Sequence, residues 1–383
     1  MTHINPVDLT ARLIRCKSVT PDEGGAISLL EGILREADFV CTRIERGGVH
    51  NLYARFGIEG PVFGFNGHTD VVPPGDESLW THPPFSGIIV DGILWGRGAT
   101  DMKSGVAAFV AAAIEATRSG IPGSIAIMIT GDEEGSAKDG TLAILDWMEE
   151  NDQRINHCIV GEPTSLEDFG DMIKVGRRGS INVELVARGK QGHVAYPHRA
   201  RNPIHVLVKL LNYIVSRKLD EGTSYFGPST LAVTTIDVDN PTTNVIPAEA
   251  RARFNIRFND AHTGASLKKW INGVAIAFSA GTDVAIDVIA SISGESFVTE
   301  VGDFTDILVA VLDNATGNVP ELSTSGGTSD ARFMTRLCPV VELGLTGLTM
   351  HQVDERVPVK EIHQLYEVYL EIIRRYFANP PKA

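Results

Sequence analysis

Apolar positions repeat along this chain at helical spacing in some stretches and at strand-like spacing in others. Residues 5–40 carry helical spacing on both sides of Thr20-Pro21 and predict two helices. Residues 124–130 form an almost unbroken apolar run, as in a strand of a parallel sheet that is covered on both faces. The other elements predicted in this part are strands 51–56, 62–66 and 157–160, a hairpin around Asp91-Gly92, a helix from Asp101 to about Ala116, and helix 142–150.

The pattern changes at Ser180. The elements that follow have the ferredoxin-like order β-α-β-β-α-β, over residues 181–188, 202–216, 229–238, 249–258, 265–278 and 283–289. We therefore predict a domain at 180–292 that is inserted into a mixed-sheet α/β domain formed by 1–179 and 293–383. The closing part is predicted to hold helix 304–316, strand 340–345 and helix 359–377.

The composition is that of an ordinary globular protein, with 43% apolar and 21% charged residues in 383. That length suits two domains of about 100–200 residues each. No basic-then-apolar leader is present at the start, and no window reaches the ~18 apolar residues of a membrane span. We therefore expect a cytoplasmic protein without a membrane partner. The net charge of −14 argues against a nucleic-acid partner, which requires a basic face.

Several predicted strands end in an acidic or imidazole side chain. The residues at these strand ends are His68, Asp70, Glu133, Glu134 and Glu162. Open α/β sheets place their binding sites at this carboxyl edge. Asp101 stands at a similar junction, between a glycine-rich segment and a predicted helix, and His351 lies in a late loop.

These side chains suit a pair of divalent metal ions. Two ions about 3.5–4 Å apart need a bridging carboxylate or water, and further nitrogen or oxygen ligands on each ion. Three carboxylates and one bridging hydroxide balance the charge of two divalent cations, whereas buried carboxylates alone would repel or take up protons. Mixed imidazole and carboxylate ligation favours zinc, cobalt or manganese over calcium. The candidate ligands are His68, Asp101, Glu134, Glu162 and His351.

Each candidate also has an ordinary structural interpretation. Asp101 has the position of a helix N-cap, and a lone loop histidine such as His351 is usually a surface residue. His68 and Asp70 face the same side of a strand, so we expect Asp70 to accept the Nδ1 proton of His68 and fix the ligating tautomer. The joint occurrence of these residues at strand and helix ends favours the metal site.

Five segments together resemble the M20 family of dinuclear-zinc amidohydrolases and peptidases. They are Gly67-His68-Thr69-Asp70, residues 96–103, residues 130–135, Gly161-Glu162-Pro163 and the late His351. The resemblance covers nearly the whole chain. It implies an α/β, mixed-sheet, zinc-exopeptidase-like catalytic domain with an inserted ferredoxin-like dimerisation domain, and hence a homodimer. It also implies two Zn²⁺ ions, with Co²⁺ as an alternative in the second site.

The resemblance assigns roles to the candidate residues. The expected ligands are Asp101 as the bridge, His68 and Glu162 on one ion, and Glu134 and His351 on the other. Glu133 stands beside a ligand without being committed to an ion. It is expected to take a proton from the bridging water and deliver it to the leaving amine, with Asp70 as a further catalytic residue.

The resemblance also implies residues that bind the substrate. They are Arg178, Asn244, Arg257, Ser325, Gly326 and Gly327. The arginines suit substrate carboxylates, which guanidinium groups bind in a bidentate way, and the loop offers backbone and hydroxyl donors. His193 is expected to reach the active site of the second copy and donate to the oxyanion. The ordinary alternative for His193 is a loop histidine near a strand end.

The loop around Ser325 is most similar to family members that remove a succinyl group from a diamino acid. The expected reaction is hydrolysis of N-succinyl-LL-2,6-diaminopimelate to succinate and LL-2,6-diaminopimelate, in lysine and cell-wall precursor synthesis. The alternatives are deacetylation of N-acetylornithine, cleavage of a dipeptide, and a non-catalytic metal-binding relative. We do not expect a phosphate-binding loop, because Gly96-Arg-Gly98 lacks Gly-Lys-Ser/Thr. We do not expect a serine hydrolase either, because Ser325 does not stand in a Gly-x-Ser-x-Gly elbow.

Overall fold

The computed structural model describes residues 4–382. The chain divides into two compact units. The first comprises Met1–Val175, Thr299–Ser323 and Ser329–Ala383, and the second comprises Gly176–Val298 and Thr324–Thr328. The second unit thus extends beyond the 180–292 expected from the sequence. The reason is that β9 (Gly176–Arg177) pairs with β16 (Phe297–Val298) in a ribbon too short to show a period.

Within the described residues, the first unit is built on an eight-stranded mixed sheet with the order β1-β2-β6-β3-β7-β18-β8-β17. Neighbouring strands from β6 to β18 run parallel, while β1 and β2 are antiparallel. This is the α/β mixed-sheet class predicted from the sequence. The strands are β1 Val40–Arg46, β2 Val49–Phe56, β3 Val62–His68, β6 Ser124–Thr130, β7 His157–Val160, β8 Met172–Lys174, β17 Glu321–Ser323 and β18 Val340–Glu342.

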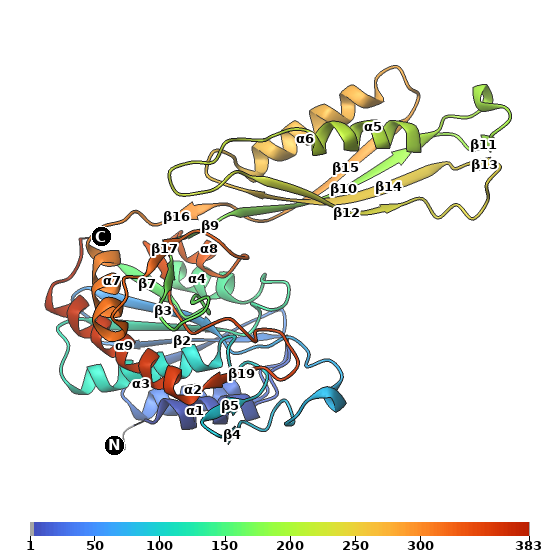
Figure 1. The fold of residues 1–383 in the computed structure, drawn as a ribbon. Coiled ribbons are helices and arrows are strands. Elements are labelled where there is room, and N and C mark those ends of the chain that lie inside the picture. The colour runs from blue at the N-terminus through green and yellow to red at the C-terminus, as the bar shows by residue number, and fades with distance from the viewer. Residues whose placement is uncertain (1–3, 383) are drawn as a thin grey trace. The chain divides into compact units, whose positions relative to one another are not determined.

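Helices cover the sheet of the first unit on both faces, and Figure 1 shows α3 and α9 on one face and α4 on the other. Every residue of β6 is consequently buried, which explains its unbroken apolar run. The ring of Phe63 on β3 packs against Phe109 of α3 and Tyr376 of α9, with centroids 6.2 and 4.6 Å away. The helices are α1 Pro6–Arg15, α2 Ala26–Glu36, α3 Lys103–Arg118, α4 Thr141–Glu150, α7 Asp303–Thr316, α8 Ala331–Met334 and α9 Val359–Ala378, with a 3₁₀ turn at Glu77–Leu79.

A small antiparallel sheet of the first unit brings together two segments that are distant in sequence. The hairpin expected around Asp91-Gly92 is formed by β4 (Ile88–Val90) and β5 (Ile93–Trp95). On its other edge β5 pairs with β19 (Arg356–Pro358). The chain just before Asp101 therefore lies beside the chain just after His351.

The second unit has the predicted element order and an antiparallel sheet in the order β12-β14-β10-β15. Its two helices lie side by side on one face of that sheet (Figure 1) and bury a core that includes Leu185, Leu211, Phe254 and Ile271. The elements are β10 Gly179–Arg188, α5 Pro203–Val215, β12 Thr230–Asp237, β14 Glu249–Phe258, α6 Gly264–Ser279 and β15 Ala285–Gly294. A separate ribbon is formed by β11 Gly192–His193 and β13 Val245–Ile246, and Pro197–Arg199 is a 3₁₀ turn.

Among residues 4–382, none of the helices combines the length and the apolar character that crossing a membrane would require.

Candidate metal centre

The sheet of the first unit explains why the strand-end residues meet. Strands β6, β3 and β7 are parallel neighbours, so their carboxyl ends share one edge. His68 is the last residue of β3, the pair Glu133-Glu134 follows β6, and Glu162 follows β7. That edge is where open α/β sheets form their sites.

Asp101 comes from the loop before α3 and does not act as the helix cap that its position suggested. The N-cap residue of α3 is Met102, and no side chain caps this helix end. The Asp101 carboxylate instead lies between two imidazoles. Its Oδ1 is 3.0 Å from Nε2 of His68, and its Oδ2 is 3.2 Å from Nε2 of His351.

The five candidate ligands fall into two groups that share Asp101. His68, Asp101 and Glu162 form one group, and Asp101, Glu134 and His351 form the other. Within each group the candidate ligand atoms all lie within 4.8 Å of one another. Nε2 of His68 is 3.7 Å from Oε1 of Glu162, and Nε2 of His351 is 2.9 Å from Oε1 of Glu134. The structure thus brings together the residues that the sequence singled out, in the same two sets.

The charge balance of this cluster fits two divalent cations. Burial, together with the charge of Asp101, raises the pKa of Glu162 well above its ordinary value. Burial acts to lower the pKa of His68, but the hydrogen bond to Asp101 and the surrounding carboxylates outweigh it and raise that pKa. Hydrogen bonds to Asp101 and Glu134 raise the pKa of His351 to about 10. Each of these raised pKa values favours a bound proton. Two metal ions would supply that positive charge in place of the protons.

Asp70 has a different place from the one expected. Nδ1 of His68 lies 2.9 Å from the main-chain carbonyl oxygen of Asp70 and 3.7 Å from its carboxylate. The carbonyl therefore accepts the Nδ1 proton and leaves Nε2 free to ligate. The Asp70 carboxylate instead accepts the main-chain N–H groups of Glu133 and Glu134, at 3.3 and 3.0 Å. Asp70 thereby fixes the turn that carries both glutamates.

Glu133 belongs to neither ligand group, although it is adjacent to Glu134 in sequence. Burial raises its pKa well above the ordinary value, and the charges of Asp330, Asp101 and Glu134 act in the same direction. A carboxylate that is near the ligands but free of them can accept and release a proton.

The remaining candidates lie in the second unit, at two opposite ends of it (Figure 1). His193 is exposed in β11 beside β13, and the next residue, Val194, donates its N–H to the carbonyl of Asn244 at 3.1 Å. Arg178 follows β9 at the other end. Burial lowers the pKa of Arg257, and the charge of the nearby Arg178 lowers it further. The loop Ser325-Gly326-Gly327 joins this end through the Ser325 carbonyl, which accepts from Arg177 at 3.2 Å.

Sequence reasoning missed Arg97 and Glu355, which form a buried ion pair of 2.7 Å next to the ligand loops. Arg97 lies within residues 96–103, one of the segments that resemble the family, but nothing in the sequence indicated that it has a role different from that of the neighbouring glycines. Glu355 lies in a polar loop, where a single glutamate gives no signal of burial.

Residues 64–375 match the family described as Peptidase family M20/M25/M40. The chain is 58% identical over 377 residues to a succinyl-diaminopimelate desuccinylase of Paracoccus denitrificans, covering 98% of this chain and 99% of that protein. A protein of the same name from Caulobacter vibrioides is 56% identical over 375 residues, covering 98% of this chain and 97% of the other.

Solved structures share the fold at low sequence identity. The M20 family metallo-carboxypeptidase Sso-CP2 of Sulfolobus solfataricus matches with a TM-score of 0.79 and 16% identity, covering 98% and 99% of the two chains. The YXEP protein of Bacillus subtilis, described as a dinuclear metal binding peptidase, matches with a TM-score of 0.72 and 15% identity, covering 97% and 98%. From the family match and the full-length relatives, we conclude that the chain belongs to the M20/M25/M40 peptidase family.

Proposed function

We propose that this chain hydrolyses N-succinyl-LL-2,6-diaminopimelate and releases succinate and LL-2,6-diaminopimelate. The observation that carries the proposal is the 58% identity, over 98% of the chain, with a succinyl-diaminopimelate desuccinylase. The two ligand groups around Asp101 give this amide hydrolysis its chemical basis. The reaction belongs to lysine and cell-wall precursor synthesis, and a cytoplasmic location stays a prediction.

Zn²⁺ is the proposed ion in both groups, with Co²⁺ as an alternative in the group of Glu134 and His351. The mixed imidazole and carboxylate donors support this choice. When bound, two such ions supply Lewis acidity toward the amide carbonyl and lower the pKa of a bound water toward about 7.

Glu133 is the proposed proton carrier. It takes one proton from the attacking water, whose oxygen bonds to the amide carbon, and delivers that proton to the departing nitrogen as the C–N bond breaks. The main-chain N–H of Glu133 donates a hydrogen bond to the Asp70 carboxylate, and this bond holds the backbone of Glu133 in place. The products are the protonated amine and the succinate carboxylate, because the second proton of the water also ends on the amine.

The arginines of the second unit are the proposed partners for substrate carboxylates. Nη1 of Arg257 is buried and has no hydrogen-bond partner among the described residues. Burial lowers the pKa of Arg257, and the charge of Arg178 adds to this. A carboxylate bound between these two cations would relieve both effects. Asn244 and the loop Ser325-Gly326-Gly327 are proposed as further substrate contacts.

His193 is proposed to donate to the carbonyl oxygen, from a second copy of the chain. Its Nδ1 accepts the N–H of Ala195 at 3.0 Å, so the neutral ring carries its proton on Nε2, where it can donate. Strand β10, whose ten residues span roughly 33 Å, lies between Arg178 and His193. Because that length exceeds a small substrate, one copy cannot supply both side chains to the same molecule.

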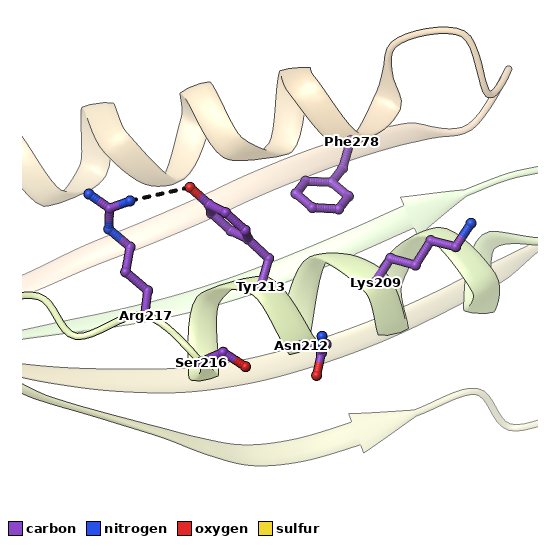
Figure 2. Close-up of a pocket in the computed structure, with 6 residues that line it drawn as sticks. All are labelled: Lys209, Asn212, Tyr213, Ser216, Arg217 and Phe278. Carbon is purple, nitrogen blue, oxygen red and sulfur yellow. Dashed lines mark hydrogen bonds between the residues drawn. The ribbon is translucent and has the colours of Figure 1, made fainter.

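The second unit has features that suit a homodimer interface. Strand β12 forms an edge of its sheet, and edge strands are usually covered. A shallow groove runs between α5 and α6 (Figure 2), lined by Lys209, Asn212, Tyr213, Ser216, Arg217 and Phe278. The same two helices expose the apolar side chains of Val208, Val215 and Ile276. These features support a second copy as the partner.

The proposed reaction is tested with protein stripped by a chelator and then given zinc or cobalt. Succinate release from N-succinyl-LL-2,6-diaminopimelate is measured beside N-acetylornithine and a dipeptide, with a Glu133→Gln preparation as the blank for contaminating enzymes. Metal-dependent activity that strongly favours the succinyl substrate is the expected result. Preference for the acetyl substrate or the dipeptide would overturn the substrate assignment, and no activity on any of them would overturn the function.

A further inference from the structure

The two ligand groups are held in place by different means. His68 is fully buried at the end of β3, and Glu162 follows β7, so the sheet itself positions both. His351 lies in a loop with a positive φ of 62°, and its side chain is 46% exposed. Packing therefore holds this imidazole less firmly than it holds the buried ring of His68. Its distance to Asp101, some 250 residues earlier in the chain, therefore depends on how the two loops are joined.

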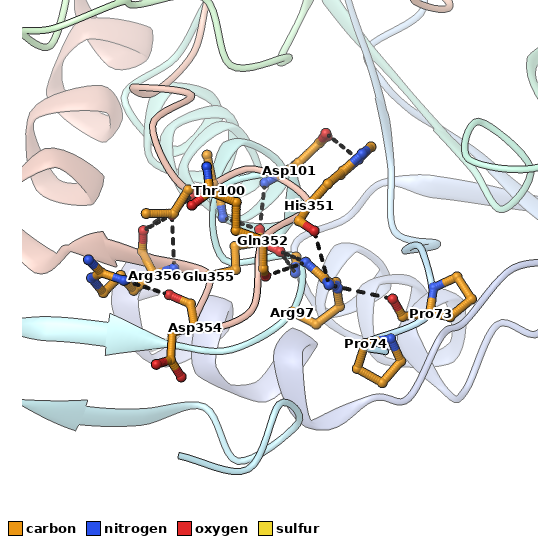
Figure 3. A network of polar contacts seen from close by, with 12 residues as sticks. Pro73, Pro74, Arg97, Thr100, Asp101, His351, Gln352, Asp354, Glu355 and Arg356 are labelled. Carbon is orange, nitrogen blue, oxygen red and sulfur yellow. Dashed lines mark hydrogen bonds and ion pairs between the residues drawn. The ribbon is translucent and has the colours of Figure 1, made fainter. Parts of the chain in front are cut away.

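Glu355 is fully buried, and its carboxylate joins these two loops (Figure 3). Oε2 accepts hydrogen bonds from Nη1 of Arg97 at 2.7 Å and from the N–H of Gly98 at 3.0 Å. Oε1 accepts the N–H groups of Thr100 and Asp101, at 2.8 and 3.1 Å. One carboxylate thus holds the backbone of the shared ligand Asp101 from a position four residues after His351.

Arg97 completes the connection from the other side. Its guanidinium donates to the carbonyl oxygens of His351 at 3.5 Å and of Gln352 at 3.2 Å. It also donates to the carbonyl of Pro73 at 3.4 Å, in the loop that follows His68 and Asp70, and lies over the ring of Trp80 at 5.2 Å. Figure 3 shows these bonds converging on one guanidinium between the three loops.

We propose that the buried Arg97–Glu355 pair is a positioning device that sets the distance between Asp101 and His351. The pair touches no substrate and ligates no ion itself. It acts through the backbones of the two ligands and thereby determines how tightly the group of Asp101, Glu134 and His351 binds its ion. The group of His68 and Glu162 depends on it less, since the sheet positions those two. This inference rests on the proposed dinuclear hydrolase.

Two substitutions probe the pair. In Glu355→Gln the amide nitrogen must face either Arg97 and Gly98 or Thr100 and Asp101. Both alternatives set donor against donor, and Arg97 stays buried without its counter-charge. Arg97→Lys keeps the positive charge but loses the planar fork that reaches the carboxylate and the carbonyls together. Each change loosens the connection without replacing a ligand side chain.

The test is a zinc titration of the metal-free proteins by calorimetry, with a competing chelator to bring tight binding into range. For wild type we expect two ions. For Glu355→Gln we expect the ion in the group of His68 and Glu162 to bind within about threefold of its wild-type affinity. The second ion, in the group of Glu134 and His351, should bind at least about tenfold more weakly than in wild type, as for other residues that orient metal ligands. Arg97→Lys should shift the second ion in the same direction. The matched control is Asp220→Asn, which alters a carboxylate with several hydrogen bonds in the second unit.

Unchanged affinity for both ions in Glu355→Gln and Arg97→Lys would overturn the proposal. Equal weakening of both ions would also overturn it, because a general loss of structure would act on both groups alike. If Glu355→Gln does not fold, Arg97→Lys provides the same comparison. The proposed function can fail separately from this proposal: wild type would then bind two ions and cleave no succinyl amide. The changes that Glu355→Gln causes in the affinities for the two ions would still decide the role of the pair.

Discussion

Glu133 and Glu134 are adjacent, and the turn held by Asp70 gives them different surroundings. Glu134 lies 2.9 Å from His351 in a ligand group, whereas Glu133 belongs to neither group. In the proposed mechanism these two residues therefore have different roles, since Glu134 ligates an ion and Glu133 carries the proton.

Replacing Glu133 tests that separation. Glu133→Gln should keep two bound zinc ions and lose about 10²–10⁴-fold in kcat, because the amide cannot take up the proton of the attacking water. Metal content by elemental analysis and steady-state kinetics measure the two effects. The paired variant Glu134→Gln should instead lose affinity for one ion. Wild-type turnover in Glu133→Gln would remove this residue from the mechanism.

Asp220 is a second residue whose environment predicts a measurable effect. Its carboxylate accepts from the N–H groups of Gly222 and Ser229 and from the amide of Asn259, and Nε2 of His262 lies 3.0 Å away. Burial acts to raise the pKa of Asp220, but the hydrogen bonds from Ser229, Gly222 and Asn259 outweigh it and hold that pKa below its ordinary value. The ionised form therefore stabilises the folded second unit.

Because the folded pKa is depressed, this stabilisation is complete above the ordinary Asp pKa of about 3.9 and is lost as the pH falls below it. Asp220→Asn should lower the free energy of unfolding by about 1–3 kcal/mol at pH 7. The difference from wild type should stay constant down to about pH 5 and shrink below about pH 4. Denaturant unfolding at a series of pH values measures it, and a difference that grows toward acid would contradict the assignment.

At the scale of elements, helix α3 and the chain before Glu162 approach each other at a glycine. A Cβ on Gly105 would lie 2.5 Å from the carbonyl oxygen of Gly161. Only a residue without a side chain lets α3 pack this closely beside the ligand segment. The same helix follows Asp101, so the contact links two of the proposed ligands, Asp101 and Glu162.

Gly105→Ala should destabilise the protein by about 1–3 kcal/mol, because the helix or the Gly161 segment must move. It should also weaken zinc binding through Glu162. The matched control is Gly273→Ala in α6, where a Cβ meets nothing within 4 Å, and which should stabilise by about 0.4–1 kcal/mol. Denaturation midpoints and zinc affinity are the measurements. Equal effects of the two substitutions would contradict this account of the contact.

Most elements could be predicted from their apolar spacing, and the misses have local causes. Strand β1 was missed because its buried residues Cys41 and Ile44 stand three apart, a spacing that does not alternate. The strands β8, β17 and β19 have three residues each, too few to show a period. Long elements such as α9 and β14 were predicted nearly to the residue, since each carries several turns or alternations.

At the scale of the whole molecule, the proposed active site needs two copies of the chain. The prediction is tested by mixing two inactive variants, Glu133→Gln and His193→Ala. If His193 acts in the second copy, mixed dimers contain one complete site, and activity should return to at most about a quarter of the wild-type rate. Light scattering on each variant measures the dimer itself. Mixtures that stay inactive although subunits exchange would mean that His193 does not act across the dimer.

The family resemblance implied how the candidate ligands divide into two sets. The sequence by itself determined most of the elements, the fold class and the candidate ligands. These depend on local spacing and on residue types at strand ends, which neighbouring positions reveal. Only the tertiary structure decided that the Asp70 main chain orients His68, and that Arg97 and Glu355 join the loops of Asp101 and His351. A buried charge paired across some 250 residues leaves no periodic trace in the chain. Its role depends on which donors surround it after folding, and no local pattern contains that information.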